Sequence, residues 1–146
     1  MEIEVKSFDE LSTKQLYELL QLRNEVFVVE QDCVYQDIDG KDERALHIMG
    51  WEDGKLVAYA RCFQTGDYFD KASIGRVLVR ENYRKLGYGH AITKASIQAI
   101  KTNYKADTIK ISAQTYLVIF YESHGFKTTG ERYLEDGIPH IAMVRA

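Results

Sequence analysis

Apolar residues follow a period of two in several short stretches of the chain and a helical period in others. Strands are predicted where apolar residues alternate with polar ones or form short β-branched runs. These stretches are residues 3–8, 45–51, 56–63, 72–79 and 107–113, with a last strand that follows a turn within 135–144. Between the second and third stretches, Asp53 and Gly54 supply the positive backbone dihedrals of a tight turn, which predicts an antiparallel hairpin.

Helices are predicted in three places. Ser12 and Gln15 have the spacing of a capping box, in which each side chain bonds a free N–H of the first helical turn, and the apolar residues that follow predict a helix to about residue 30. A second helix begins around Gly89. A short apolar third helix ends at Gly125, whose lack of a side chain suits a left-handed C-terminal cap.

The elements follow the order strand, helix, hairpin, strand, helix, strand, helix and strand. This order predicts an α/β (α+β) fold with a mixed sheet. The chain has 146 residues, no internal repeats, no low-complexity tract and one proline. We therefore expect a single domain spanning residues 1–146.

Composition narrows the classes of partner. The chain has 19 basic and 22 acidic side chains, without the positive excess of nucleic-acid binders, so no nucleic-acid partner is expected. Cys33 and Cys62 form no CxxC pair, and the four histidines show no paired ligand spacing, so neither a disulfide framework nor a metal site is expected. Lacking a signal-like N-terminus or an apolar window of about 20 residues, the sequence predicts a cytoplasmic protein with no membrane partner.

The stretch RVLVRENYRKLGYGHAI, residues 76–92, joins a predicted strand to a predicted helix through a basic turn. Such a junction gathers unpaired N–H groups and the positive end of a helix dipole, which attract phosphate. Gly87 and Gly89 allow a ligand to approach the backbone, while Arg84 and Lys85 add positive charge beside it. The pattern lacks both the G-x-G-x-x-G dinucleotide fingerprint and the Lys-Ser/Thr pair of a P-loop.

Several motifs in one order resemble the GNAT superfamily of acyl-CoA N-acyltransferases. Residues 84–89 are similar to its R/Q-x-x-G-x-G/A pyrophosphate motif, and FYESHGF at 120–126 is similar to its F-Y-x-x-x-G-F helix end. The stretches LRNEVFVVEQ, YQDIDGKDERALH and EDGIPHIAM resemble the ElaA-like branch of that superfamily. This resemblance covers nearly the whole chain. It implies the GNAT fold, a mixed and mostly antiparallel sheet of about seven strands flanked by helices, with a splayed central strand pair.

The resemblance also implies where acetyl-CoA, the acyl-donor cosubstrate, binds. The strand that ends at Val79 splays from the strand containing TIKIS, and the pantetheine arm lies between them like an added strand. The donor-binding positions that match the family are Val77, Leu78, Val79, Arg84, Lys85, Gly87, Tyr88, Gly89 and His90.

In this family an amine attacks the thioester directly within a ternary complex, which requires a base, an oxyanion donor and an acid. The N–H of Leu78 or Val79 matches the oxyanion donor, and Tyr121 matches the proton donor for the leaving thiolate. A phenol with a pKa of about 10 is protonated at neutral pH, although its transfer to a thiolate whose acid has a pKa of about 8.5 is uphill. The alternative for Tyr121, one of ten tyrosines, is a packing role.

The base is the open part of the mechanism. Many relatives carry Glu or His on the strand before the phosphate turn, with the same parity as Val77 and Val79, where this chain has Ser73 and Gly75. Neither is a base, so water, the solvent or a residue elsewhere must take the proton. The candidates for that residue, which are also candidates for binding the acceptor, are Glu30, His47, Glu135 and His140.

Two further groups of residues bear on the acceptor. Arg23 and Glu30, with Gln31, resemble branch residues that face the acceptor pocket. The acidic residues Asp37, Asp39, Asp42 and Glu43 form either a solvated loop or a surface that attracts a cationic acceptor.

The sequence is therefore interpreted as an N-acetyltransferase that transfers acetyl from acetyl-CoA to a primary amine of a small molecule or peptide. One rival is a non-catalytic acyl-CoA-binding or sensor module, which the missing strand base favours. The other rival is an acyl-homoserine-lactone-synthase-like acyltransferase, because the stretch EVFVVEQ of this chain resembles the early segment of that related family. The acceptor, the acyl-chain length and the oligomeric state stay open, a homodimer included.

Overall fold

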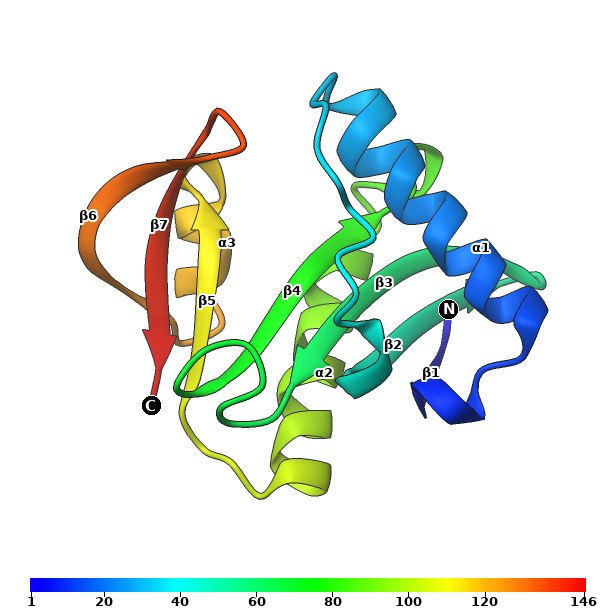
Figure 1. The fold of residues 1–146 in the computed structure, drawn as a ribbon, viewed down its shortest axis with the longest axis horizontal. Helices are drawn as coiled ribbons and strands as arrows, with labels where there is room; N and C mark the ends of the chain where they lie inside the picture. Colours follow the sequence, from blue (N-terminus) through cyan, green and yellow to red (C-terminus); the bar gives the residue numbers. More distant parts are fainter.

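The computed structural model describes residues 1–146 and contains one seven-stranded sheet with helices on both faces (Figure 1). The strand order is β1-β2-β3-β4-β5-β7-β6, and every neighbouring pair is antiparallel except β4 and β5. The strands are β1 (Glu2–Ser7), β2 (Leu46–Glu52), β3 (Lys55–Phe63), β4 (Ala72–Val79), β5 (Ile109–Gln114), β6 (Lys127–Glu135) and β7 (Ile138–Arg145). The predicted mixed, mostly antiparallel sheet is confirmed.

The two central strands separate after a short parallel contact. Pairing between β4 and β5 is limited to Ala72 with Ile109 and Ser73 with Lys110. Beyond these pairs the strands diverge, and Figure 1 shows the opening between them. The edge of β4 that faces β5 is therefore without a strand partner over most of its length, as the predicted splayed pair requires.

The helices cover both faces of the sheet. On one face, α1 (Thr13–Arg23) packs Leu19 and Leu22 against apolar residues of β2, β3 and β4. On the other face, α2 (Tyr88–Tyr104) and α3 (Val118–Glu122) contribute Ile92, Ile100 and Tyr121 to a larger core. None of these helices combines the length and the apolar character that a membrane crossing requires. The short 3₁₀ turns are η1 (Phe8–Glu10), η3 (Asp42–Arg44), η4 (Glu81–Tyr83) and η5 (Thr115–Leu117).

The first helix begins where the capping box predicts and changes type before its end. The Gln15 N–H donates to Ser12 Oγ at 3.1 Å, and the Ser12 N–H donates to Gln15 Oε1 at 3.0 Å. After Arg23 the chain continues as the π-helix η2 (Asn24–Glu30), a wider spiral that hydrophobic spacing did not predict. Such π segments are rare and are frequently found at functional sites.

A β-bulge changes which side chains of β4 share a face. Arg76 has a φ of 51°, and the register with β3 shifts between the Arg61–Gly75 pair and the Tyr59–Leu78 pair. One extra residue in a strand reverses the alternation beyond it. The sequence-based expectation that Ser73 and Gly75 share the parity of Val77 and Val79 is therefore wrong.

The strand β6 is the element that the sequence pattern missed. Its nine residues, KTTGERYLE, are all exposed and mostly polar, and they form the edge of the sheet beside β7. Gly130 has a φ of 70° at the register shift between β6 and β7, which lies between Thr129 and Tyr133. A strand that buries no face lacks the alternating pattern from which strands are recognised.

Candidate active site

The glycine junction between β4 and α2 forms one end of a cavity of about 550 Å³, which we call the junction cavity. The backbone N–H groups from Lys85 to His90 find no acceptor within the protein, neither in the backbone nor in a side chain. Gly87, with a φ of 81°, has nothing within 4 Å of where a Cβ would stand, and at Gly89 the nearest atom to that position is on the Phe120 ring, 3.5 Å away. The junction therefore offers a row of free donors at the positive end of a helix.

Two side chains at the junction, those of Arg84 and Tyr88, are bonded to partners within the protein. Arg84 donates from Nε to the Val79 carbonyl at 2.9 Å, and its guanidinium pairs with Glu30 at 2.7 Å. The Tyr88 hydroxyl donates to the Glu52 carboxylate in a short hydrogen bond. Arg84 and Tyr88 line the junction cavity with Val77, Leu78, Val79, Lys85, Gly87, Gly89 and His90, so all nine sequence-predicted donor positions border one space.

The Val79 amide points into the opening between β4 and β5. The Arg80 N–H donates to the Val57 carbonyl of β3 at 2.7 Å. Because amide directions alternate along a strand, the Leu78 N–H faces β3 as well, whereas the Val79 N–H faces away from it. Of the two predicted oxyanion donors, the geometry favours Val79.

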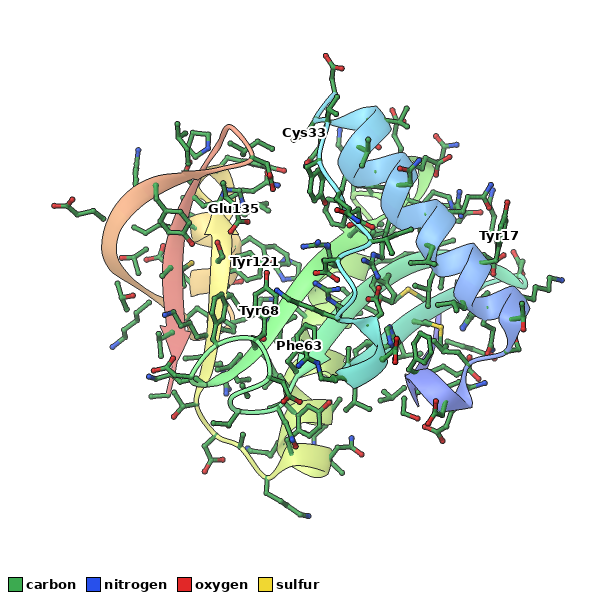
Figure 2. All side chains as sticks on the ribbon, in the orientation of Figure 1. Tyr17, Cys33, Phe63, Tyr68, Tyr121 and Glu135 are labelled. Carbon is green, nitrogen blue, oxygen red and sulfur yellow. The ribbon has the colours of Figure 1, made fainter.

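A second cavity, of about 120 Å³, lies in the wedge between β4 and β5, and we call it the wedge cavity. It is bordered by β4 and β5, by the loop that carries Tyr68 and by the turn between β6 and β7. Figure 2 shows Glu135 on the β6 side of the opening and Cys33 on the side of the segment that follows η2. There the Cys33 thiol donates to the Asp136 carbonyl at 3.4 Å, so the two sides meet at one contact.

The two cavities meet at Tyr121. Six residues border both, namely Phe27, Gln31, Val77, Gln114, Leu117 and Tyr121. The Tyr121 side chain is 8% exposed, its ring packs edge-on against Phe120 and Phe126, and its hydroxyl has no hydrogen-bond partner. Burial, aided by the nearby Tyr116, raises the pKa of Tyr121 above its ordinary value, so the phenol keeps its proton. Tyr121 thus presents an unpaired O–H donor where the cavities join.

The acceptor-side candidates differ in where they lie. Glu135 and His140 border the wedge cavity, with 3.3 Å between Glu135 Oε2 and His140 Nε2, and Ser112 donates to the other carboxylate oxygen at 3.3 Å. Glu30 borders the junction cavity through its pair with Arg84. His47 and Arg23 are fully buried and border neither cavity.

His47 is occupied on both ring nitrogens. Nδ1 lies 2.6 Å from the Tyr59 hydroxyl and Nε2 lies 2.9 Å from the Asp42 carbonyl. Burial lowers the pKa of His47, which favours the neutral ring. Such a histidine connects β2, β3 and the loop after η2, and it has no free nitrogen for an acceptor.

The acidic loop is neither a solvated charge run nor an open attractant for cations, which corrects both sequence-based interpretations of it. Asp37 and Asp42 are 5% and 7% exposed. Three arginines pair with Asp37, Asp39 and Asp42 at 2.6–3.0 Å, in the pairs Arg23–Asp37, Arg23–Asp42, Arg61–Asp39, Arg61–Asp42 and Arg76–Asp37. This cluster, hereafter the Arg–Asp cluster, fixes the loop behind the wedge cavity. Only Glu43 of the predicted acidic group is outside it.

The sequence analysis missed Arg61, Arg76, Tyr35 and Tyr68, all of which border the wedge cavity. Arg61 carried a usable signal, because a charge in the middle of the apolar strand β3 must find a partner once buried. The acidic loop supplies that partner. No feature of the sequence around Tyr68, other than the turn that contains it, indicates a place in the site.

Comparisons with known proteins agree with this geometry. The family model described as an acetyltransferase (GNAT) domain matches residues 9–146. Protein ElaA of Escherichia coli strain K12 is 46% identical over 138 residues, which cover 93% of this chain and 90% of that protein. Its crystal structure has a TM-score of 0.93 at 43% identity and covers 99% of both chains. The crystal structure of an acyl-CoA N-acyltransferase from Pseudomonas aeruginosa has a TM-score of 0.94 at 41% identity and covers both chains fully.

A more distant structure shares the fold alone. The CoA-dependent acyl-homoserine lactone synthase MesI has a TM-score of 0.77 at 16% identity, over 98% of this chain and 87% of that chain.

Proposed function

Because this chain belongs to the GNAT family of acyl-CoA N-acyltransferases, we propose that it transfers an acetyl group from acetyl-CoA to a primary amine of a small molecule or peptide. Residues 1–146 act as one catalytic domain in this proposal. The observation that carries it is the meeting of two cavities at Tyr121, one of them ending in the free N–H groups from Lys85 to His90.

The junction cavity suits the donor. A diphosphate accepts hydrogen bonds from consecutive backbone N–H groups and is stabilised by the positive end of α2. Lys85 supplies mobile positive charge, and Arg84 can add its own once it leaves Glu30. The unpaired edge of β4 at Val77 and Val79 suits the amide groups of the pantetheine arm, which then binds as an added strand.

The wedge cavity suits the acceptor. Its opening carries the carboxylates of Glu135 and Asp136, while the charges of the Arg–Asp cluster balance one another. An ammonium group is therefore attracted to the Glu135 side of the cavity. Glu135 is held by Ser112 and His140, and we assign it the task of receiving the acceptor's proton.

Direct attack within the ternary complex then needs few groups. The amine nitrogen forms a bond to the thioester carbonyl carbon, and the Val79 N–H stabilises the oxyanion that develops. When the C–S bond breaks, Tyr121 donates its proton to the departing thiolate, and the nitrogen, which has already given one ammonium proton to Glu135, loses a second proton that restores the Tyr121 phenol. The raised pKa of Tyr121 secures the protonated phenol but makes this transfer more uphill, so the acid acts as the thiolate forms rather than before.

The test combines binding with turnover. Acetyl-CoA at a hundredfold over its dissociation constant should stabilise the fold by roughly 2.7 kcal/mol, whereas adenosine without phosphates should not. A panel of primary amines is then screened by release of free CoA. A thermal shift without turnover of any amine would mean that the protein is the non-catalytic acyl-CoA-binding module. That rival is supported by the lack of a basic side chain at Ser73 and Gly75, two residues of β4 that border the wedge cavity. No thermal shift at all would contradict both.

A further inference from the structure

Two buried polar atoms beside the wedge cavity have no hydrogen-bond partner. They are Arg61 Nε and Ser73 Oγ, the only side-chain nitrogen or oxygen atoms in the protein that are both unpaired and completely shielded from solvent. The two residues are 1% and 2% exposed, and both border the wedge cavity. Buried polar groups are nearly always bonded, because an unpaired one keeps the full cost of losing water. Two of them beside one cavity indicate a site whose partner comes from a ligand.

The sheet register places an open space between these atoms. Arg61 of β3 stands opposite Gly75 of β4, and Ser73 stands opposite Phe63. Because both pairs precede the bulge at Arg76, the side chains of Arg61 and Ser73 project from the same face of the sheet. Gly75 has nothing within 4 Å of where a Cβ would stand on that face. Gly75 is thus the floor of a space that Arg61 and Ser73 flank.

The charges around this space do not favour the binding of an anion. The terminal nitrogens of Arg61 donate to Asp39 at 2.8 and 2.9 Å and to Asp42 at 3.0 Å. With Arg23, Arg76 and Asp37, the Arg–Asp cluster contains equal numbers of positive and negative groups. A carboxylate bound here would lose its hydration without a compensating positive charge, because the Arg61 guanidinium is already neutralised by aspartates. A neutral oxygen accepts from the Arg61 Nε–H without adding charge.

We propose that the space above Gly75 binds a neutral oxygen of the acceptor, a hydroxyl or an amide carbonyl, which accepts from the Arg61 Nε–H and bonds the Ser73 hydroxyl. This inference rests on the proposed function, since it assigns the acceptor class of the same cavity. A carbonyl oxygen accepts from both groups, and a hydroxyl accepts from Arg61 while donating to Ser73 Oγ.

The size of the cavity limits how far this oxygen lies from the reacting amine. Tyr121 and Glu135 border the same cavity of about 120 Å³ as Arg61 and Ser73. A compact acceptor therefore places its nitrogen near Tyr121 and its oxygen near Gly75 at the same time. Short amino alcohols and amino amides fit this description, whereas plain alkylamines leave Arg61 Nε and Ser73 Oγ without a hydrogen-bond partner.

The experiment compares matched amines on the whole protein. Glycinamide and 3-aminopropanol are measured against glycine, propylamine and butylamine, both as acceptors by CoA release and as ligands by NMR titration with acetyl-CoA present. We expect glycinamide and 3-aminopropanol to exceed the alkylamines at least tenfold in kcat/KM and in affinity, because a buried polar site rejects analogues that leave it unpaired. Glycine should bind more weakly than glycinamide.

Two substitutions test the site itself. Ser73→Ala removes one hydrogen bond, and Gly75→Ala places a methyl group in the open space. Each should cost the oxygen-bearing amines about threefold to tenfold more than it costs the matched alkylamines, which bind in the same cavity but make no hydrogen bond to Ser73 or Arg61. The thermal shift with acetyl-CoA should persist in both variants, which shows that the fold and the donor site are intact.

The outcomes separate this inference from the proposed function. If no amine is acylated, the proposed function fails, and the NMR titrations still decide whether the site selects a neutral oxygen. The inference is overturned if alkylamines bind as well as their oxygen-bearing counterparts, or if glycine binds better than glycinamide. It is also overturned if Ser73→Ala weakens all amines equally, since the orphan atoms would then hold a structural water.

Discussion

Gly75 and Val77 lie on opposite faces of β4, because Arg76 between them has a φ of 51°. Gly75 faces the side of Arg61, whereas Val77 packs against the core beneath α2, and both residues border the wedge cavity. The bulge thus divides β4 into a segment whose side chains face the wedge cavity and a segment whose edge borders the junction cavity.

The bulge predicts an unusual order of stability for substitutions at Arg76. Arg76→Ala and Arg76→Gly both lose the ion pair with Asp37. The difference between their free energies of unfolding therefore measures the cost of the backbone conformation at this position. Within a regular strand Gly is less stable than Ala by about 0.5–1 kcal/mol, but a left-handed residue costs a non-glycine about 1–2 kcal/mol. We expect Arg76→Gly to be the more stable variant by roughly 1 kcal/mol in urea unfolding.

The control for Arg76 is Thr128, an exposed residue of β6 paired with Met143 in regular register. There the order should be the ordinary one, with Thr128→Ala more stable than Thr128→Gly. An Arg76→Ala variant as stable as Arg76→Gly would contradict the bulge.

Gly87 should be required for binding the donor rather than for folding. Gly87→Ala forces a side chain into a φ of 81° and adds a methyl group beside the free N–H groups of the junction. We expect a loss of roughly 1 kcal/mol in stability and the disappearance of most of the acetyl-CoA thermal shift.

Gly54 offers a matched control for Gly87, because its φ is 76° and no atom lies within 4 Å of a Cβ there. Gly54→Ala should carry the same backbone cost but retain the full thermal shift. Equal acetyl-CoA thermal shifts in the two variants would show that the glycine junction is not part of the donor site.

Much of this architecture follows from local sequence. The capping box of Ser12 and Gln15, the Asp53-Gly54 turn and the glycine junction each depend on neighbours within a few residues, and the structure has all three. The π-helix η2, the bulge at Arg76 and the edge strand β6 depend on packing between distant segments, and their local patterns are those of an ordinary helix, strand and loop.

The candidate site divides in the same way. Contiguous donor positions around Gly87 could be read from one stretch, because a phosphate turn is a local backbone structure. The wedge cavity, the proposed acceptor side, combines Arg61, Ser73 and Glu135 from three strands. Asp37 and Asp42 were expected in solvent because the sequence gives no sign that arginines of α1 and β3 lie opposite them.

Tyr121 should act in turnover and not in donor binding. Tyr121→Phe keeps the buried ring but removes the hydroxyl that faces the meeting point of the cavities. We expect an unchanged acetyl-CoA thermal shift and a fall in kcat of about a hundredfold or more, the usual range for loss of a general acid. Tyr116→Phe, which alters an exposed tyrosine of the junction cavity only, should retain activity. Normal turnover by Tyr121→Phe would show that Tyr121 is not the general acid.

Glu135 should be required for cationic acceptors. Glu135→Gln keeps the shape of the side chain but removes the negative charge beside His140 and Ser112. We expect kcat/KM for amines to fall about tenfold to a hundredfold, with the donor thermal shift unchanged. The matched control is Glu131→Gln on the same exposed strand, which borders neither cavity. If both variants behaved as the wild type, the proton would have to leave by another route.

The Arg–Asp cluster predicts a loss of stability in acid that can be traced to Asp39. Burial alone would raise the pKa of Asp39, but two hydrogen bonds from Arg61 and its charge outweigh burial and lower it to about 2. A carboxylate with a lowered pKa stabilises the fold above its unfolded pKa and loses that contribution as the pH falls through its folded pKa. The window is therefore about pH 4 to pH 2, and the pKa of Asp42 is lowered in the same direction because Arg23 outweighs its burial.

Asp39→Asn should remove this contribution at neutral pH and flatten the acid dependence. From the fall of the pKa from 3.8 to about 2 we expect a loss of about 2 kcal/mol at pH 7, measured by urea unfolding. About half of the difference between the variant and the wild type should be gone at pH 3. Asp9→Asn, at an exposed position without an ion pair, should follow the wild type throughout. A difference between Asp39→Asn and the wild type that stays constant from pH 7 to pH 3 would mean that Arg61 does not hold this carboxylate in its charged form.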